Sequence, residues 1–313
     1  MGGYRMFLNR INRSSSLIRT CAAGLCTVVL LVSCGKKSGS TAGDKASIQV
    51  KGSDTMVNVA QAWAEEYVTV DTTVNVEVSG GGSGVGIAAL ERGTIDIANA
   101  SRDMKPEEAQ AAEKNTGKKP KEFIVGFDAM AVYIHKDNPL DEITLDQLKE
   151  IFAEGGTTTK WSQLGIKIPD ATSDEIVRVS RQSSSGTYEF FREHVLKQVD
   201  FKLGSRDMNG SKEVVELVGN TKTAIGYSGM GYATDEVKML KINTDAGSFA
   251  PTVQNTVDKK YPLARSLNIY TLGEPEGAIK KYIDWILSAE GQKIVEDNGY
   301  VPTVVAQAEN SAA

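Results

Sequence analysis

The sequence predicts an α/β protein whose two lobes are joined by hinge strands around a central ligand cleft. From about Ile48, strand-like alternation and helical spacing follow each other in turn, which is typical of a layered fold with a largely parallel sheet. Two long apolar segments, residues 123–134 and 263–271, are suited to strands that cross between lobes. A hinge of this kind opens a cleft, which is where small ligands commonly bind. We expect lobe I to comprise residues 46–129 and 266–313, and lobe II residues 130–265.

The N-terminus predicts an exported lipoprotein. Four arginines and no acidic residue precede the apolar run at residues 21–32, which is too short for a permanent transmembrane helix and is typical of a signal peptide. Residues 31–34 resemble the lipobox of bacterial lipoproteins, which implies cleavage before Cys34 and lipidation of its thiol, with palmitate among the attached chains. Ordinary signal cleavage nearby, with Cys34 incidental, is the alternative. We expect a signal peptide at residues 1–33, a flexible tether at residues 34–46, and an extracytoplasmic location in the periplasm or on the outer face of the cell membrane.

Two strand-to-helix turns in the first half of the chain are rich in glycine and hydroxyl side chains. The strand at residues 47–51 runs into the turn at 52–56 and an amphipathic helix. The strand at 74–78 runs into the glycine-rich turn at 80–86 and an apolar helix. Glycine lets the backbone approach a ligand closely, and hydroxyl groups rotate to suit its oxygens. A flexible linker is the alternative for the glycine run.

The third turn of this kind carries a fixed cation. A strand at residues 177–180 leads into Arg181, three serines, a glycine and a threonine, and helical spacing follows at residues 189–196. Backbone N–H groups, the positive end of a helix and a guanidinium would then face one spot, a combination that holds an anion. For a single copy, a solvated loop with a serine cap is the alternative. Three copies of the design favour an anion site.

The remaining segments continue the layered pattern. We expect the three tryptophans to pack in cores, because an inorganic anion has no face on which an aromatic ring can stack. The further predicted elements are a strand at residues 94–98, a helix from Pro106, a helix at 145–152 capped by Thr144, and helices at 275–287 and 290–298.

Charge and composition exclude several classes of function. Without the four arginines of the signal peptide, the net charge of the chain is near −9. The sequence also has no basic stripe with interleaved aromatic residues, so we expect no nucleic-acid partner. The glycine run lacks the Lys-Ser/Thr ending of a P-loop and the G-x-G-x-x-G spacing of a dinucleotide-binding turn. His135 is expected at a strand end on the surface and His194 too far along its helix to reach the anion. No nucleophile elbow and no metal-ligand spacing are present, so we expect no catalytic residues, no cofactor and no metal.

The three turns, together with residues 100–102 and 224–227, resemble the phosphate-binding lipoproteins of bacterial phosphate ABC transporters, the PstS family. The similarity runs from about residue 48 to about residue 302. It implies a two-lobed class II periplasmic binding protein that takes inorganic phosphate and delivers it to the membrane subunits of an ABC permease, and we expect a monomer anchored to the membrane by its N-terminal lipid. The expected phosphate-binding residues are Ser53, Asp54, Thr55, the Met56 amide, Ser83, Ser101, Arg102, Arg181, Ser185, Gly186 and Thr187.

Two positions depart from the family pattern. Some family members have a carboxylate at the position of Arg102, directly after Ser101, and use it to accept the proton of phosphate. A second aspartate of the family, two residues after the arginine of the third turn, is replaced by Ser183. Asp54 is the nearest remaining acceptor, or alternatively the N-cap of a helix that starts at Thr55. Arg102 is either a second cation for the ligand or the partner of an acid. Another tetrahedral oxyanion such as sulfate is therefore an alternative ligand, and a secreted hydrolase or phosphatase, or an adhesion lipoprotein, is the alternative class.

Overall fold

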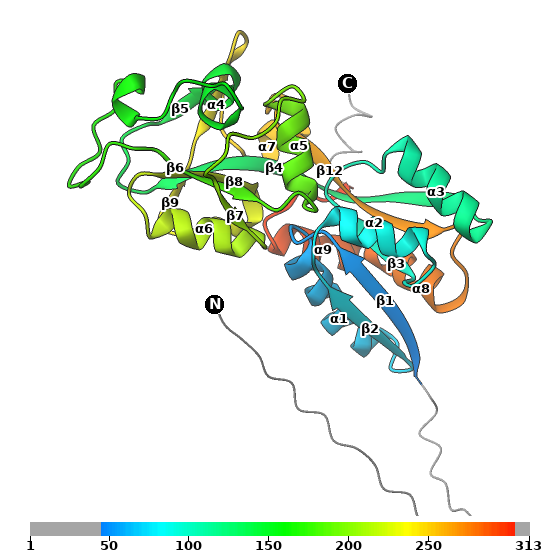
Figure 1. Cartoon of the computed structure of the whole chain (residues 1–313). Coiled ribbons are helices and arrows are strands. Elements are labelled where there is room, and N and C mark those ends of the chain that lie inside the picture. Colours follow the sequence, from blue (N-terminus) through cyan, green and yellow to red (C-terminus); the bar gives the residue numbers. More distant parts are fainter. Residues whose placement is uncertain (1–44, 304–313) are drawn as a thin grey trace, which may run out of the picture. The chain divides into compact units, whose positions relative to one another are not determined.

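The computed structural model describes residues 45–303, in which strands and helices alternate along much of the chain (Figure 1). The strands are β1 (Ala46–Gly52), β2 (Val74–Ser79), β3 (Ile97–Ala100), β4 (Pro120–His135), β5 (Glu142–Thr144), β6 (Val177–Arg181), β7 (Arg206–Met208), β8 (Ala224–Gly229), β9 (Val237–Met239), β10 (Lys241–Thr244), β11 (Gly247–Phe249) and β12 (Ala264–Leu272). The α-helices are α1 (Val57–Val70), α2 (Ser83–Glu91), α3 (Pro106–Thr116), α4 (Leu145–Phe152), α5 (Gly186–His194), α6 (Ser211–Gly219), α7 (Val253–Val257), α8 (Gly277–Ile286) and α9 (Ala289–Asp297), and η1 (Trp161–Leu164) and η2 (Met230–Tyr232) are 3-10 helices. The predictions for the signal peptide, for Cys34 and for most of the tether fall outside the described residues.

The main sheet has the order β2-β1-β3-β12-β4-β8-β6-β7, and β9 pairs with β4 outside this path. Strand β1 lies parallel to β2 and β3, and β6 lies parallel to β7 and β8. In the middle, β12 pairs antiparallel with both β3 and β4, and β4 pairs antiparallel with β8. The expected parallel arrangement therefore holds only for the outer strands. The two central strands run in opposite directions, since one carries the chain across the sheet and the other returns it.

The two long strands predicted from the apolar segments are β4 and β12. Residues 120–129 of β4 pair with β12, with a shift in register between Leu267 and Asn268. Residues 130–135 of the same strand pair with β8 and β9 instead. A single strand is thus shared between the two ends of the sheet, as Figure 1 shows for the long green β4 arrow beside the orange β12. The lobe boundaries themselves stay a prediction.

Separate apolar clusters pack on the two ends of the sheet. One joins α1, α8 and α9 to β1 and β3, and in it the rings of Tyr67 and Tyr282 lie edge to face with centroids 4.8 Å apart. Another joins α4 and α5 to β8, where the Phe191 ring stacks on Tyr227 at 4.0 Å. Core positions for the three tryptophans are confirmed, because Trp63, Trp161 and Trp285 are all buried.

The helices begin close to where the sequence predicts. The Thr144 cap of α4 is confirmed, since its side chain accepts a hydrogen bond from the amide of Gln147. Helix α3 begins at Pro106, which is favoured at a first helical position because it needs no hydrogen-bond partner for its nitrogen. Across the stretch from residue 45 to residue 303, no helix combines the length and the apolar character needed to cross a membrane.

A buried ion pair that the sequence did not predict lies between the neighbouring strands β4 and β12. Arg265 faces Asp128 directly in the register of the two strands, and both side chains are buried. The Arg265 Nε and Nη2 atoms donate to Asp128 Oδ2 at 3.0 and 2.8 Å. The other carboxylate oxygen accepts from the amide of Met230 at 3.0 Å. The pair therefore ties β12 to β4 and to the residue that follows β8.

Replacing Asp128 with Asn should destabilise the fold by about 3–5 kcal/mol, because it leaves the Arg265 guanidinium buried without its counter-charge. Urea unfolding followed by far-UV circular dichroism measures this change. The matched control is Asp284→Asn, which removes an exposed pair with Lys280 and should cost less than about 0.5 kcal/mol. Equal effects of the two substitutions would contradict the role given to the buried pair.

Candidate functional site

The three predicted turns meet in the structure through their hydroxyl groups. The Ser53 hydroxyl donates to Ser101 Oγ at 2.9 Å, and Ser83 Oγ lies 3.4 Å from the same oxygen. Thr55 Oγ1 and Thr187 Oγ1 are 2.9 Å apart although the two residues are 132 positions apart in the chain. All five side chains are buried. A compact cluster of hydroxyl groups thus joins the turns after β1, β3 and β6 to the start of α2.

Glycine is required at two positions of this cluster because other atoms come too close for a side chain. A Cβ atom at Gly52, where φ is +146°, would lie 2.1 Å from the carbonyl oxygen of Asn99. A Cβ atom at Gly186 would lie 2.3 Å from Ser83 Oγ and 2.8 Å from Ser101 Oγ. The first residue of α5 therefore has its backbone directly against the hydroxyls of the other turns.

Helices α5 and α2 begin within the turns that the sequence predicts. Ser185 caps α5, and its Oγ accepts from the amides of Thr187 and Tyr188 at 3.1 and 3.4 Å. Helix α2 starts at Ser83, directly after the glycine run. This run is an ordered turn between β2 and α2, so the alternative of a flexible linker is wrong.

Asp54 does not cap a helix, so that alternative is also wrong. Helix α1 starts at Val57 after Met56, with no side-chain cap, and the Met56 amide donates to the carbonyl oxygen of Ser53. Asp54 Oδ1 instead accepts from the amide of Gly81 at 2.7 Å, and Oδ2 lies 2.8 Å from Arg181 Nη2. Asp54 therefore links the first turn to the second and to the guanidinium of the third.

Arg181 is buried at the centre of these contacts. Besides the Asp54 carboxylate, its guanidinium donates to Ser211 Oγ and to the carbonyl oxygen of Asn209, both at 3.0 Å. Burial lowers the pKa of Arg181, and the charge of Asp54 opposes that shift. Within residues 45–303 its Nε has no hydrogen-bond partner. A buried N–H donor without an acceptor is costly, so this guanidinium is suited to a further anionic partner.

Arg265 supplies a second guanidinium next to the hydroxyl cluster. Its Nη2 lies 3.3 Å from Thr55 Oγ1, and its Nη1 donates to the carbonyl oxygen of Ser101 at 3.2 Å. The Phe190 ring of α5 covers it at 5.4 Å. Sequence reasoning missed this residue. The sequence does contain a sign of this pair, because Asp128 and Arg265 are charged residues within the two long apolar strands.

Arg102 pairs with an acid, which was one of its two predicted alternatives. Its Nη1 and Nη2 atoms donate to the two carboxylate oxygens of Glu108 at 2.8 and 2.6 Å. Burial disfavours the charged form of Glu108, but hydrogen bonds from Arg102 and from the amide of Lys105 outweigh it, so the pKa of Glu108 is lowered. Arg102 is thereby held at the first turn of α3, beside Ser101.

Further contacts join α5 and its turn to the second turn and to the start of α3. The Gly84 amide donates to the carbonyl oxygen of Ser184 at 3.0 Å, and Ser184 Oγ donates to the Gly81 carbonyl at 3.1 Å. At the rim, Lys105 Nζ lies 2.7 Å from a carboxylate oxygen of Glu189. The turn at Asp54 and Thr55 is fixed from behind, where the Tyr232 hydroxyl donates to the Asp54 carbonyl and the Tyr300 hydroxyl to the Thr55 carbonyl.

The two histidines take no part in the cluster. His194 Nδ1 lies 3.2 Å from the carbonyl oxygen of Phe190, and its ring stacks on the Phe190 ring. His135 ends β4 as expected but is buried rather than on the surface, because its Nδ1 accepts the amide of Asp137 in a tight turn. In the described part of the chain, no three His, Cys, Asp or Glu side chains are grouped so that they could hold a metal ion.

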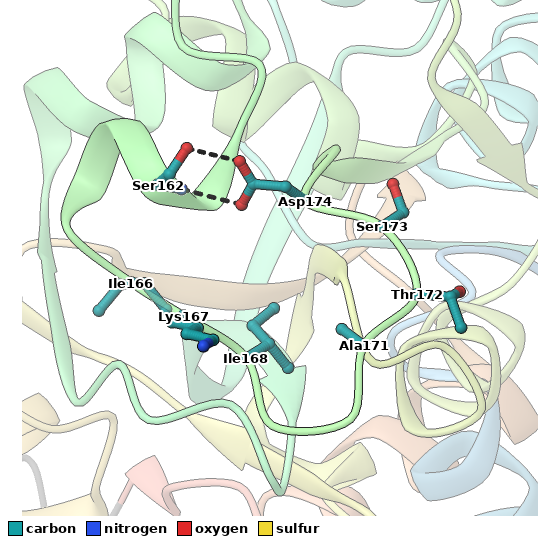
Figure 2. A pocket seen from close by; sticks show the side chains of 8 residues that line it. All are labelled: Ser162, Ile166, Lys167, Ile168, Ala171, Thr172, Ser173 and Asp174. Atoms are coloured by element: carbon teal, nitrogen blue, oxygen red, sulfur yellow. Dashed lines mark hydrogen bonds between the residues drawn. The ribbon is translucent and has the colours of Figure 1, made fainter.

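Two pockets show where the surface is hollowed. One of about 470 Å³ opens beside the cluster and is lined by Arg102, Lys105, Glu189, His194 and Arg265 among others. Another of about 410 Å³ lies in the loop at residues 162–174, where Ser162 donates twice to the Asp174 carboxylate (Figure 2). This second pocket contains none of the predicted site residues, so of these two pockets the first belongs to the candidate site.

Comparison with known proteins gives the class to which this fold and site belong. A family model described as the PBP superfamily domain matches residues 39–290. The phosphate-binding protein PstS of Pseudomonas aeruginosa is 33% identical over 88% of this chain and 88% of its own length. The PstS protein of Bacillus subtilis is 30% identical over 88% of this chain and 90% of its own length. The chain therefore belongs to the PstS family within the PBP superfamily.

Solved structures agree with this assignment. A putative phosphate ABC transporter substrate-binding protein from Clostridium perfringens, solved with bound phosphate, matches with a TM-score of 0.72 and 32% identity, covering 82% of this chain and 99% of that one. An ABC-type phosphate transport receptor from Vibrio cholerae matches with a TM-score of 0.65 and 27% identity, covering 81% and 99%. The class of fold predicted from the sequence is confirmed.

The lowered pKa of Glu108 predicts an acid-sensitive contribution to stability. A carboxyl group whose pKa is lower in the folded state stabilises the fold above its unfolded pKa, about 4.3 for Glu, and loses that effect as pH falls through the folded pKa. Glu108→Gln should therefore reduce the free energy of unfolding at neutral pH. The free energy of unfolding of the variant should also decrease less as the pH is lowered. Urea unfolding between neutral and acidic pH measures both effects.

The control for this substitution is Glu107→Gln on the same turn of α3. The Glu107 side chain is exposed, and across residues 45–303 it forms no ion pair. If both variants lost stability equally and with the same pH dependence, the Arg102–Glu108 contact would not be the source of the effect.

Proposed function

We propose that this protein is an extracytoplasmic solute-binding protein that captures inorganic phosphate and delivers it to an ABC permease. The observation that carries the proposal is the buried Arg181 guanidinium beside hydroxyl groups from three strand-to-helix turns. Membership of the PstS family supports it, as does the phosphate bound in the relative from Clostridium perfringens. An oxyanion at this place would be held by charge-assisted hydrogen bonds in a site largely removed from water.

Short-range contacts must supply the affinity, because the chain is acidic overall. Net negative charge does not attract an anion, and exposed charges are screened beyond about 8 Å at physiological salt. Helix α5 begins at Gly186 against the hydroxyls of Ser83 and Ser101, so the positive end of this helix lies beside the cluster. We propose Ser53, Thr55, Ser83, Ser101, Arg181, Ser185, Gly186 and Thr187 as the phosphate-binding residues. Asp54, the Met56 amide and Arg102, which were also expected to bind phosphate, are left out of the proposed set because each is bonded to another group of the protein.

We propose that capture closes two lobes, residues 46–129 with 266–313 and residues 130–265. In this division Asp54 and Arg181 belong to different lobes, and so do Lys105 and Glu189. Ligand favours the closed form only through contacts that the open form lacks. Arg181 and the start of α5 are on the opposite side from Thr55, Ser83 and Ser101, so a phosphate contacted from both sides stabilises closure.

A binding role is favoured over a hydrolase. A serine nucleophile needs a base within hydrogen-bond reach and a group that orients that base. Ser53, Ser83 and Ser101 contact one another and backbone groups, whereas His194 contacts the carbonyl of Phe190. The relatives that support the family assignment are named as binding proteins and transport receptors.

We propose that the mature protein is a monomer held at the membrane by lipid on Cys34, the residue at the end of the lipobox-like segment. Cys34→Ser should release the protein into the soluble fraction, because the thiol is the attachment point of the lipid. Fractionation of cells that express the full chain, with labelled palmitate as the tracer, measures both location and lipidation. Retention of label and membrane location in the variant would reject Cys34 as the anchor.

Arg181→Ala should weaken phosphate binding by about 2–5 kcal/mol, because it removes the buried cation and leaves Asp54 without its partner. Calorimetric titration of residues 45–313 with phosphate measures the change. The control is Arg178→Ala, three positions earlier on β6, whose side chain donates to the Leu203 carbonyl and should leave affinity nearly unchanged. Circular dichroism confirms that each variant is folded.

Two results of this titration would count against the proposal. Near-normal affinity in the Arg181 variant would remove this residue from the site. No binding of phosphate by the unchanged protein would reject the function itself.

A further inference from the structure

The turn between β7 and α6 places a chemically labile pair of residues beside the guanidinium of the site. In the sequence, glycine directly follows asparagine at Asn209–Gly210 and at Asn298–Gly299. In such a pair the backbone nitrogen of the glycine can attack the side-chain carbonyl carbon of the asparagine, because glycine has no Cβ atom and its backbone adapts freely. The surroundings of the two pairs decide which of them reacts.

Asn209 has the exposure and the unrestrained backbone that this reaction needs. It is exposed, in a bend between the end of β7 and the first residue of α6. Across residues 45–303 the Gly210 amide donates no hydrogen bond, so its nitrogen is not held by another group. Gln182 Nε2 donates to Asn209 Oδ1. A donor on this oxygen stabilises the negative charge that forms there when the carbonyl carbon is attacked.

Asn298 has the opposite surroundings. It follows the last residue of α9, and its Nδ2 donates to the carbonyl oxygen of Ile294 at 2.9 Å. The Gly299 amide donates to the carbonyl oxygen of Glu296, also at 2.9 Å. Attack by the Gly299 nitrogen would break both hydrogen bonds. Asn298 therefore provides a reference with the same pair of residues in a protected place.

The backbone carbonyl of Asn209 is a hydrogen-bond partner of the arginine in the site. Arg181 Nη2 donates to this oxygen at 3.0 Å, and Nη1 donates to Ser211 Oγ at 3.0 Å. The same guanidinium pairs with the Asp54 carboxylate at 2.8 Å. A change of charge at residue 209 would therefore act directly on Arg181.

We propose that Asn209 is a site of spontaneous deamidation, and that its conversion weakens the binding of an oxyanion. The first half rests on the turn alone, and the second half rests on the proposed function. The Gly210 nitrogen bonds to Cγ of Asn209, its proton passes to the side-chain nitrogen, and ammonia leaves a cyclic imide. Water then opens this ring at one of its two carbonyl carbons. In total, an amide and one water become a carboxylate and an ammonium ion.

Both ways of opening the ring leave a new carboxylate on residue 209. Opening at Cγ gives aspartate. Opening at the backbone carbonyl carbon gives isoaspartate, in which the chain continues through Cγ and the carbonyl that accepts from Arg181 becomes the free carboxylate. Together with Asp54, the buried guanidinium then faces two negative charges. An incoming anion is repelled, because charges in a buried site are only weakly screened.

The first measurement follows the mass of residue 209 in the purified protein over time at mildly alkaline pH, which promotes loss of the amide proton. Proteolytic digestion and mass spectrometry separate asparagine, aspartate and isoaspartate at positions 209 and 298 of the same sample. Conversion should be at least about tenfold faster at 209, because two hydrogen bonds protect 298. Urea-unfolded protein provides the reference in which both positions react. Equal rates in the folded protein, or no conversion at 209, would overturn the proposal.

The second measurement is calorimetric titration of the same samples with phosphate. The fraction of sites with the initial affinity should decline in step with conversion at 209. Asn209→Asp should bind phosphate at least about tenfold more weakly from the start, because it places a like charge beside the ligand. Circular dichroism shows whether each sample remains folded. Conversion at 209 without loss of affinity would overturn the second half of the proposal.

Gly210→Ala is the matched control. Gly210 has a φ of −119°, which alanine adopts without strain, and its Cβ atom would meet the carboxylate of Glu213, the end of an exposed side chain that can move. The variant keeps Asn209 but hinders the attack on it, so its phosphate affinity should stay constant over the same period. Loss of affinity at the rate of the unchanged protein would show that Asn209 is not the cause.

The outcomes separate this inference from the function on which its second half rests. If the fresh protein binds phosphate and Asn209 does not convert, phosphate capture stands and the inference is overturned. If the fresh protein binds no phosphate, the proposed function is rejected together with the effect on binding. The masses still decide in that case whether Asn209 is a site of deamidation.

Discussion

The burial of two guanidinium groups is the constraint on which the rest of this structure depends. An unpaired buried charge costs several kcal/mol, so each arginine requires a carboxylate at a fixed place. Asp128 meets this need for Arg265 directly across two strands, and Asp54 meets it for Arg181 across 127 positions of sequence. The first pair joins the neighbouring strands β4 and β12, and the second brings the turn after β1 to the end of β6. The hydroxyl cluster lies between them.

The pairs hold the turns of the site in one arrangement. Turns usually vary in conformation, but the turn at Asp54 is held from two sides. The Asp54 carboxylate accepts from the Gly81 amide. Tyrosine hydroxyls donate to the backbone carbonyl oxygens of Asp54 and Thr55. Arg265 contacts Thr55 and Ser101, and so couples the first turn to strands β4 and β12. In the proposed mechanism, a rotation of the lobes about these two strands would change the spacing of the site hydroxyls, which links the hinge to binding.

Local patterns predicted the elements well, whereas pairings between distant residues escaped them. Helical spacing, the Thr144 cap and the glycine turns are properties of short windows, and the structure confirms them. The antiparallel centre of the sheet and the Arg265–Asp128 pair depend on which segments meet, and no window of sequence contains that information. The Asp54 cap was wrong for the same reason, because a distant arginine and the Gly81 amide bind that carboxylate while the helix begins at Val57. The resemblance to a family supplied the tertiary arrangement that the patterns lacked.

The arginines around the site are each paired with a carboxylate of the protein. Arg102 could have added a second cation to the ligand, but Glu108 binds it bidentately at the start of α3, where a carboxylate is also favoured by the helix dipole. The charge of Arg102 is thus neutralised locally, as those of Arg181 and Arg265 are. Each of these three cations is matched by an acid, so the proposed preference for an anion depends on the hydroxyl and amide groups of the turns as well as on the Arg181 guanidinium. Dipoles of this kind act over short distances and depend on orientation, so the turns must hold their hydroxyl and amide groups in fixed positions to favour an anion.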